Sequence, residues 1–211
     1  MDIEGNLRKY LGAREPTARY ASFDYCFNYF QSRRDLDELA QIATGPRLEL
    51  SCLHLGFYLA SWGMLRGSSV LLRRSVKQYG PVVEVIAAAK PEVWEIDAHR
   101  YTDEAVAALA DLGTQIRTAL PEDPSDILVT KIMLGVFGSV PAFDTYFKKG
   151  FGVWTFGRKA LQRVGEFYRN NAEVIERHRV PTISFETGKE TQRRYTRAKV
   201  IDMIFFVEGC N

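Results

Sequence analysis

The segment from Thr130 to Phe147 constrains the fold of this chain more than any other part of the sequence. It begins as an apolar helix that carries a single lysine, Lys131, and two glycines then interrupt it. Pro141 can start the next helix, because proline at a first helical position already has a helical φ. Asp144 would then lie in or next to the first turn. Since the break folds the chain back, we expect Lys131 and Asp144 to meet in one cleft.

The rest of the chain also reads as helices, because apolar residues recur at helical spacing. Thr102 is a suitable N-cap for a long alanine-rich helix, and Ser125 is suitable for the helix that carries Lys131. The segment 180–188 is expected to be a loop with a short extended piece. We predict an all-α protein with two lobes, 1–120 and 121–211, and helices over 17–31, 35–43, 48–64, 68–79, 81–89, 102–120, 125–137, 158–179 and 189–207.

Composition excludes several classes of protein. Hydrophobic residues make up 46% of the chain and charged residues 26%, which is ordinary for a globular protein. No window of about 18 apolar residues is present, so we expect no membrane span. The polar N-terminus lacks the apolar core of a signal peptide, which predicts a cytoplasmic location. The three cysteines and three histidines lack zinc-ligand spacing, so we expect no metal and no cofactor.

Charge is unevenly distributed along the chain. Ten acidic residues and three basic ones lie between Glu84 and Asp126, whereas thirteen basic and five acidic ones lie between Lys148 and Lys199. Aromatic side chains are interleaved with the basic ones, a pattern that suits a polyanionic partner. Two interpretations stay open: a nucleic-acid-binding face, or a solvated surface that offsets the acidic middle of the chain.

Asp144 and Lys131 are the candidate catalytic residues. A carboxylate in a first turn is kept ionised by the unpaired N–H groups and the helix dipole, by about 0.3–1 kcal/mol. Beside an amine, such a carboxylate can stabilise a developing cation on a substrate, as in the cleavage of a bond to a sugar. Lys131 would either act as the nucleophile or orient the carboxylate. The alternative is that Asp144 is an ordinary first-turn acid.

A second candidate element follows the predicted helix 48–64. Trp62 can stack on a base, Arg66 lies between two glycines, and Ser68 offers a hydrogen-bond donor. Glycines allow backbone to approach a ligand closely. The alternative is a helix break packed around a buried tryptophan, although an arginine between two glycines is harder to explain as packing.

The sequence Val-Pro-Ala-Phe-Asp-Thr-Tyr-Phe, which ends at Phe147, resembles the core of the helix-hairpin-helix DNA glycosylases. In that superfamily a Val-Pro-Val-Asp-like segment carries a catalytic aspartate, here matched by Asp144 with one extra residue after Pro141. Lys131 falls where the oxoguanine-type members have a lysine. The glycine-rich hairpin that grips DNA is absent, and the acidic segment 121–125 stands in its place.

This resemblance implies a two-lobed helical fold and a double-stranded DNA partner. The enzyme would act as a monomer, extrude one nucleoside and leave an abasic site. The short helical chain, with its segment Ser-Trp-Gly-Met-Leu-Arg-Gly-Ser-Ser over residues 61–69, also resembles bacterial antiphage glycosylases that act on glucosylated hydroxymethylcytosine in phage DNA. The residues implied to contact the substrate are Trp62, Arg66, Ser68, Phe143 and Tyr146, and those implied to contact DNA are Lys148, Lys149, Arg158 and Lys159.

One rival hypothesis stays open. The chain would be a non-enzymatic helical module that binds nucleic acid or a protein through the basic region 148–199. Asp144 would then be only a residue near a helix cap. No phosphate-binding loop or nucleophile elbow is present in the sequence to favour another class of enzyme.

Overall fold

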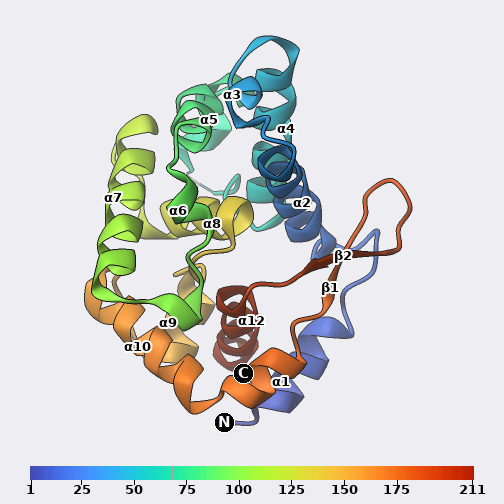
Figure 1. Cartoon of the computed structure of the whole chain (residues 1–211), viewed down its shortest axis with the longest axis vertical. Coiled ribbons are helices and arrows are strands. Elements are labelled where there is room, and N and C mark those ends of the chain that lie inside the picture. Colours follow the sequence, from blue (N-terminus) through green and yellow to red (C-terminus); the bar gives the residue numbers. More distant parts are fainter. Residues whose placement is uncertain (68) are drawn as a thin grey trace.

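The computed structural model describes residues 1–67 and 69–211 and is predominantly helical (Figure 1). One antiparallel two-stranded sheet accompanies the helices in this part of the chain. The helical class predicted from the sequence is therefore confirmed. The α-helices are α1 (Ile3–Leu11), α2 (Ala21–Asp35), α3 (Leu39–Ile42), α4 (Gly45–Ser61), α5 (Gly80–Ala87), α6 (Pro91–Trp94), α7 (Asp103–Ala119), α8 (Asp126–Phe137), α9 (Thr145–Phe151), α10 (Arg158–Asn170), α11 (Ala172–Arg177) and α12 (Arg197–Cys210); the strands are β1 (Pro181–Ile183) and β2 (Glu190–Arg194).

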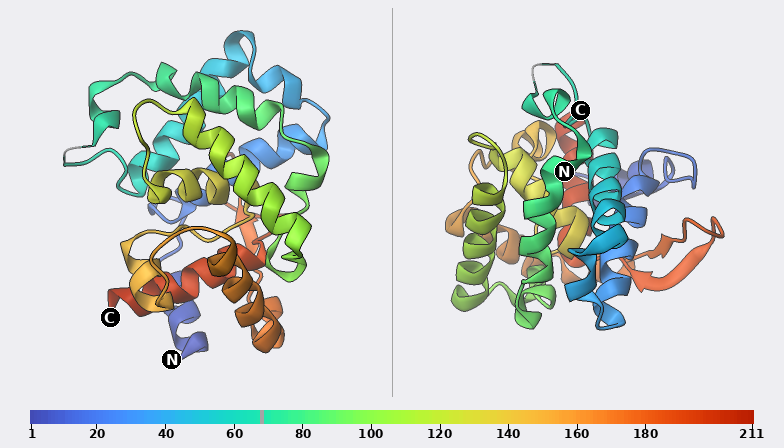
Figure 2. Two further views of the ribbon diagram at one scale, coloured as in Figure 1. Left: turned by 90° about the vertical axis from the view of Figure 1, so that its left-hand side faces the viewer. Right: turned by 90° about the horizontal axis from the view of Figure 1, so that it is seen from above.

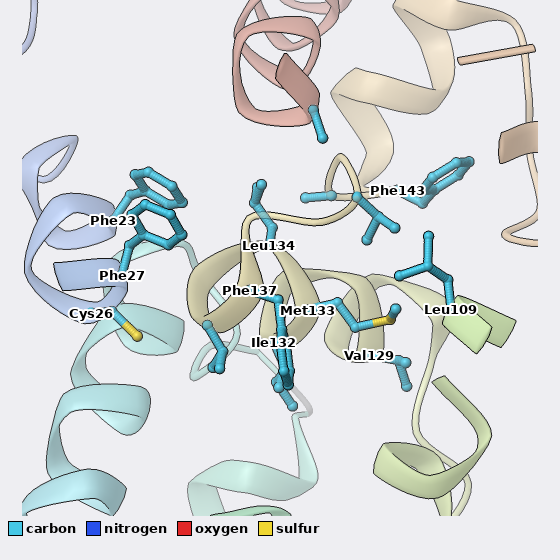
Figure 3. Close-up of a cluster of buried hydrophobic side chains, with 14 of the residues drawn as sticks. Phe23, Cys26, Phe27, Leu109, Val129, Ile132, Met133, Leu134, Phe137 and Phe143 are labelled. Carbon is cyan, nitrogen blue, oxygen red and sulfur yellow. The ribbon is translucent and has the colours of Figure 1, made fainter. Parts of the chain in front are cut away.

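Helix α8 lies at the centre of the molecule. Every residue from Leu128 to Phe137 is buried, as expected for a helix that is apolar on all sides. Figure 3 shows Phe23 and Phe27 of α2 and Leu109 of α7 around it. Lys131 is therefore an ammonium group on a helix that has no solvated face.

Two predicted helix caps are present. The Thr102 hydroxyl accepts a hydrogen bond from the Ala105 N–H at the start of α7, and the Ser125 hydroxyl accepts one from the Leu128 N–H at the start of α8. Both satisfy N–H groups that have no partner within the helix. The predicted starts of these two helices are confirmed.

The predicted helix start at Pro141 is wrong. Gly138 ends α8 with φ 65°, and residues 139–144 form a buried segment without regular secondary structure before α9 begins at Thr145. The N–H groups of Ala142 and Phe143 donate to side chains of α12 and α8 instead of joining a helix. Asp144 is consequently the N-cap of α9, next to its first turn as predicted, although the helix starts four residues later than expected.

Four other predicted helices differ from the structure. The helix expected over 35–43 is reduced to α3, and α2 extends to Asp35. The described part of 68–79 contains two short 3-10 segments, Val70–Arg73 and Val76–Tyr79. The helix expected over 158–179 is divided at Asn171 into α10 and α11. The first part of the helix expected over 189–207 is strand β2, and α12 begins only at Arg197.

The hairpin of β1 and β2 forms because side chains tie it to itself and to α2. The Thr182 and Thr191 hydroxyls lie 2.6 Å apart across the two strands, and the Arg193 guanidinium lies 2.6 Å from Asp35 of α2. β2 alternates exposed and half-buried residues, which is the period of a strand rather than of a helix. The hairpin projects from the helical body (Figure 2).

Helix α12 is buried from Ala198 to Val207 and packs against α9 and α1. Two glycines permit this close packing: a Cβ on Gly209 would lie 1.9 Å from the Tyr146 carbonyl oxygen, and one on Gly150 would lie 2.4 Å from that of Phe205. Because α1 contacts α12 and both α2 and α4 contact α8, packing crosses the boundary predicted at residue 120. The division into lobes stays a prediction. Within residues 1–67 and 69–211, no helix combines the length and the apolar character needed to cross a bilayer.

Candidate functional site

A cleft of about 420 Å³ opens where the predicted catalytic segment meets the turn after α4. Its walls come from this turn, α8, the start of α9 and the C-terminal part of α12. The side chains that line it combine aromatic rings with charges: Arg19, Trp62, Arg66, Lys131, Asp144, Tyr146 and Phe206. The cleft therefore offers both flat apolar surfaces and ionised groups to a ligand.

Lys131 and Asp144 meet at this cleft. The Lys131 Nζ lies 3.4 Å from Asp144 Oδ2 and donates a hydrogen bond of 2.8 Å to the carbonyl oxygen of Trp62. Asp144 Oδ1 accepts a bond of 3.0 Å from the Phe147 N–H. The two residues are only 5% and 8% exposed, so this ion pair is largely removed from water.

The contacts that hold the Asp144 carboxylate differ from those expected. Helix α9 has only seven residues, so its dipole is a small contribution. The direct contacts are the capping bond from the Phe147 N–H and the ion pair with Lys131. The carboxylate orientation is fixed by the same two contacts.

The pKa of Lys131 is lowered. The largest cause is burial, which penalises the charged ammonium, and the carboxylate of Asp144 opposes it. The sequence offers no cationic neighbour that would depress this pKa, and the structure supplies a different cause, the loss of hydration on an apolar helix. The lowered pKa suits the role of nucleophile, whereas the hydrogen bond to the Trp62 carbonyl restrains the amine and suits the orienting role.

The Trp62 turn forms the wall opposite Asp144. The indole ring meets Tyr20 and Phe206 edge-on, with centroids 5.5 and 5.7 Å away, and its Nε1 has no hydrogen-bond partner among the described residues. Gly63 has φ 76°, and the exposed side chain of Arg66 folds back over it. Trp62 is half-buried, so it both packs against these rings and presents a surface to the cleft.

One of the predicted contact residues does not join this group. Phe143 is fully buried and packs against Phe147 and Phe156, with centroids 5.0 and 5.5 Å away. It lies within the buried segment 139–144 and not at a helix start. Tyr146, by contrast, lines the cleft and is 43% exposed. Ser68 lies outside the described residues.

The four basic residues predicted to contact DNA lie at one helix end and one helix start. Lys148 and Lys149 are in the last turn of α9, whereas Arg158 and Lys159 begin α10. Lys148 is half-buried and the other three are exposed. Arg158 is held 2.8 Å from Asp103 of the acidic helix α7, which offsets part of its charge.

A second lysine–aspartate pair, Lys199 and Asp202 of α12, was missed by sequence reasoning. The two are 1% and 6% exposed, and Lys199 Nζ lies 2.9 Å from Asp202 Oδ2. A signal was available, because these are two opposite charges three residues apart in an otherwise apolar run. Such an arrangement on a buried helix predicts an internal ion pair.

Over the described ranges, no three His, Cys, Asp or Glu side chains are grouped so as to hold a metal ion. No protein-family model, curated protein or solved structure matches this chain. The cleft and its residues are therefore the basis for a functional hypothesis.

Proposed function

We propose that this chain is a DNA glycosylase that excises a modified base and leaves an abasic site. The observation that carries the proposal is the Lys131–Asp144 ion pair, which is buried at the wall of an aromatic cleft. The segment containing Asp144 also resembles the catalytic segment of the helix-hairpin-helix glycosylases. Both lines of support concern the same carboxylate.

Asp144 is assigned the electrostatic role. Loss of the base leaves positive, oxocarbenium-like charge on the deoxyribose, and a fixed carboxylate beside the anomeric carbon stabilises it. The Phe147 N–H and the Lys131 ammonium hold Asp144 in place before the reaction, so little reorganisation is needed during it. The same carboxylate can orient or deprotonate the attacking water.

Lys131 is assigned the orienting role rather than that of nucleophile. Its ammonium is shared between the Trp62 carbonyl and the Asp144 carboxylate, and the ion pair with Asp144 needs the proton that a nucleophilic amine must lose. Water is then the nucleophile, and the enzyme is monofunctional. The lowered pKa of Lys131 keeps the opposite assignment open to experiment.

The cleft has features that suit an extruded nucleoside. Enzymes that act on a base flip it into a pocket where it stacks on flat side chains. Trp62, Tyr146 and Phe206 offer such surfaces, and the exposed Arg19 and Arg66 line the same cleft with charges suited to phosphates. Lys148, Lys149 and Lys159 would hold the flanking DNA backbone. The substrate class is proposed from resemblance: a glucosylated hydroxymethylcytosine in phage DNA, with antiviral defence as the role.

The test is excision from defined duplexes. The purified protein is incubated with DNAs that carry cytosine, hydroxymethylcytosine, glucosylated hydroxymethylcytosine, uracil or oxoguanine, and alkali-labile sites are counted. Release of a base by the wild type and its loss in Asp144→Asn would support the proposal. Salt-dependent DNA binding without release of any base would instead favour the non-enzymatic binding module.

A further inference from the structure

The second lysine–aspartate pair lies directly beneath the candidate cleft. Lys199 and Asp202 line one small enclosed space together with Lys131, Asp144 and Trp62. The Lys199 ammonium also donates to the Tyr10 hydroxyl over 2.9 Å. Four charged side chains from three parts of the chain are thus brought together in the interior.

Asp202 is bonded to the segment that carries Asp144. Its Oδ1 accepts a hydrogen bond of 3.0 Å from the N–H of Ala142, two residues before Asp144. The next N–H along the chain, that of Phe143, donates to the Thr130 hydroxyl over 2.9 Å. Because this segment has no helix or strand of its own, these two side chains provide the hydrogen bonds that define its path.

Lys199 contacts the floor of the cleft from below. Its Nζ lies 5.4 Å from the centroid of the Trp62 ring, and that of Lys131 lies 5.7 Å from it. Ammonium groups at such distances from an indole are held by cation–π attraction, which is stronger where water is excluded. Trp62 is thereby fixed by both lysines.

Stability alone does not account for this pair. An ion pair in the interior is often no more stabilising than apolar residues of similar size, because both ions lose their hydration. Burial raises the pKa of Asp202, Lys199 opposes that rise, and Asp144 adds to it. Lys199 therefore helps to keep Asp202 ionised. The other titratable groups that face Asp202 are Lys131, Tyr10 and Tyr58.

We propose that Lys199 and Asp202 are positioning residues for the reaction: Asp202 holds the segment that presents Asp144, and Lys199 holds both Asp202 and Trp62. The proposal rests on the proposed glycosylase function for its kinetic consequences only. Its structural consequence, that the position of Asp144 depends on Asp202, is independent of any substrate.

The kinetic experiment compares Asp202→Ala with Asp202→Asn and Lys199→Met. Since displacement of a reacting group by about 1 Å can lower a rate about 100-fold, we expect Asp202→Ala to lower kcat about 10- to 100-fold and to change KM less than about threefold. Asp202→Asn retains an acceptor for the Ala142 N–H and should recover part of kcat. Lys199→Met should move the acidic limb of the pH–rate profile to higher pH, because Asp202 then takes up a proton more readily.

The matched control is Asp24→Ala. Asp24 is also a buried carboxylate in an ion pair, 3.0 Å from Arg14, and it also accepts a backbone N–H, that of Ile183, over 3.1 Å. It holds the hairpin instead of the cleft. We expect Asp24→Ala to lower stability with kcat unchanged, and an equal loss of kcat in this control would overturn the proposal.

Hydrogen exchange supplies the readout without substrate. The Phe147 N–H donates to Asp144, so its protection reports whether that carboxylate is in place. The comparison is made under conditions where Asp202→Ala and the wild type have the same global unfolding midpoint. Exchange of the Ala142 and Phe147 amide hydrogens should then be at least about tenfold faster in Asp202→Ala. Accelerated exchange in a protein that releases no base would refute the glycosylase function and uphold the positioning role. Unchanged exchange at Phe147 would refute the positioning role whatever the activity.

Discussion

The Lys131 ammonium donates to the carbonyl oxygen of Trp62, 69 residues earlier in the chain, over 2.8 Å. The same ammonium lies 3.4 Å from Asp144 Oδ2. One side chain on the central helix therefore connects the two walls of the candidate cleft. Its contacts also explain why changes on one wall should alter the chemistry assigned to the other.

The first prediction concerns the charge of Asp144. Asp144→Asn keeps the shape of the side chain and removes the charge that would stabilise the sugar cation. Single-turnover excision should fall about 10²- to 10³-fold, while circular dichroism and DNA affinity stay near the wild type. Wild-type turnover in this variant would end the mechanism proposed here.

The second prediction separates the two roles of Lys131. If the lysine only orients Asp144, Lys131→Gln should slow excision by less than Asp144→Asn does, and borohydride should trap no enzyme–DNA adduct with the wild type. The measurement is gel mobility after reduction. A trapped adduct that disappears in Lys131→Gln would make the lysine the nucleophile.

The third prediction concerns the basic residues after the cleft. Charge reversal at Lys148, Lys149, Arg158 and Lys159 should weaken DNA binding and flatten its dependence on salt, since each lost phosphate contact removes about 0.9 of slope in log K against log salt. Arg158 should contribute least, because Asp103 already pairs with it. The matched control reverses Lys77 and Lys90, exposed lysines outside this region. An unchanged slope in the fourfold variant would make the region a solvated surface.

The fourth prediction follows from the lowered pKa of Lys131. A buried lysine whose pKa falls on folding destabilises the folded state below its folded pKa, and the penalty disappears above its unfolded pKa of about 10.4. Asp144 opposes the shift, so Asp144→Asn should lower the pKa of Lys131 further. Between pH 7 and pH 9, the urea midpoint of Asp144→Asn should therefore increase more than that of the wild type does. In Asp144→Asn/Lys131→Met this relative rise should be absent, and its persistence would assign it to another group.

The fifth prediction tests the contact between α9 and α12. A Cβ on Gly209 would overlap the Tyr146 carbonyl oxygen, so Gly209→Ala should lower the free energy of unfolding by at least about 2 kcal/mol. Gly80→Ala is the control, because a Cβ there meets nothing within 4 Å. Denaturant unfolding measures both, and equal stability of the two variants would contradict the packing described.

The sequence predicted the features that depend on neighbours along the chain. Thr102 and Ser125 cap their helices as expected, because a cap needs only a side chain and the next turn. The meeting of Lys131 with Asp144 was predicted for the same reason, as one break separates them. The start of α9 was not predictable, since the N–H groups that would have joined it are taken by Asp202, 60 residues away from Ala142, and by Thr130.

The candidate site was predictable to a similar extent. Trp62 and Arg66 were identified from the glycine-containing segment in which they lie, and both line the cleft. Arg19 and Phe206 were not identified, because nothing near them in sequence indicates that α12 and the segment before α2 approach the same turn. Phe143 was misplaced for a related reason: its side chain direction depends on whether Pro141 starts a helix, and the answer comes from tertiary hydrogen bonds.

The glycine contact between α9 and α12 has a mechanical consequence for the cleft. With no side chain between the two backbones, α9 has no room to shift towards α12, and Asp144 at its start is fixed with it. The opposite wall is a turn in which Gly63 and Gly67 have positive φ and Arg66 is exposed. Adjustment to ligands of different size should therefore occur at the exposed part of this turn around Arg66, beyond the Trp62 ring that the two lysines hold, while Asp144 stays in place. Under the proposed function, substitutions around Arg66 would change which bases are accepted and leave Asp144 in position.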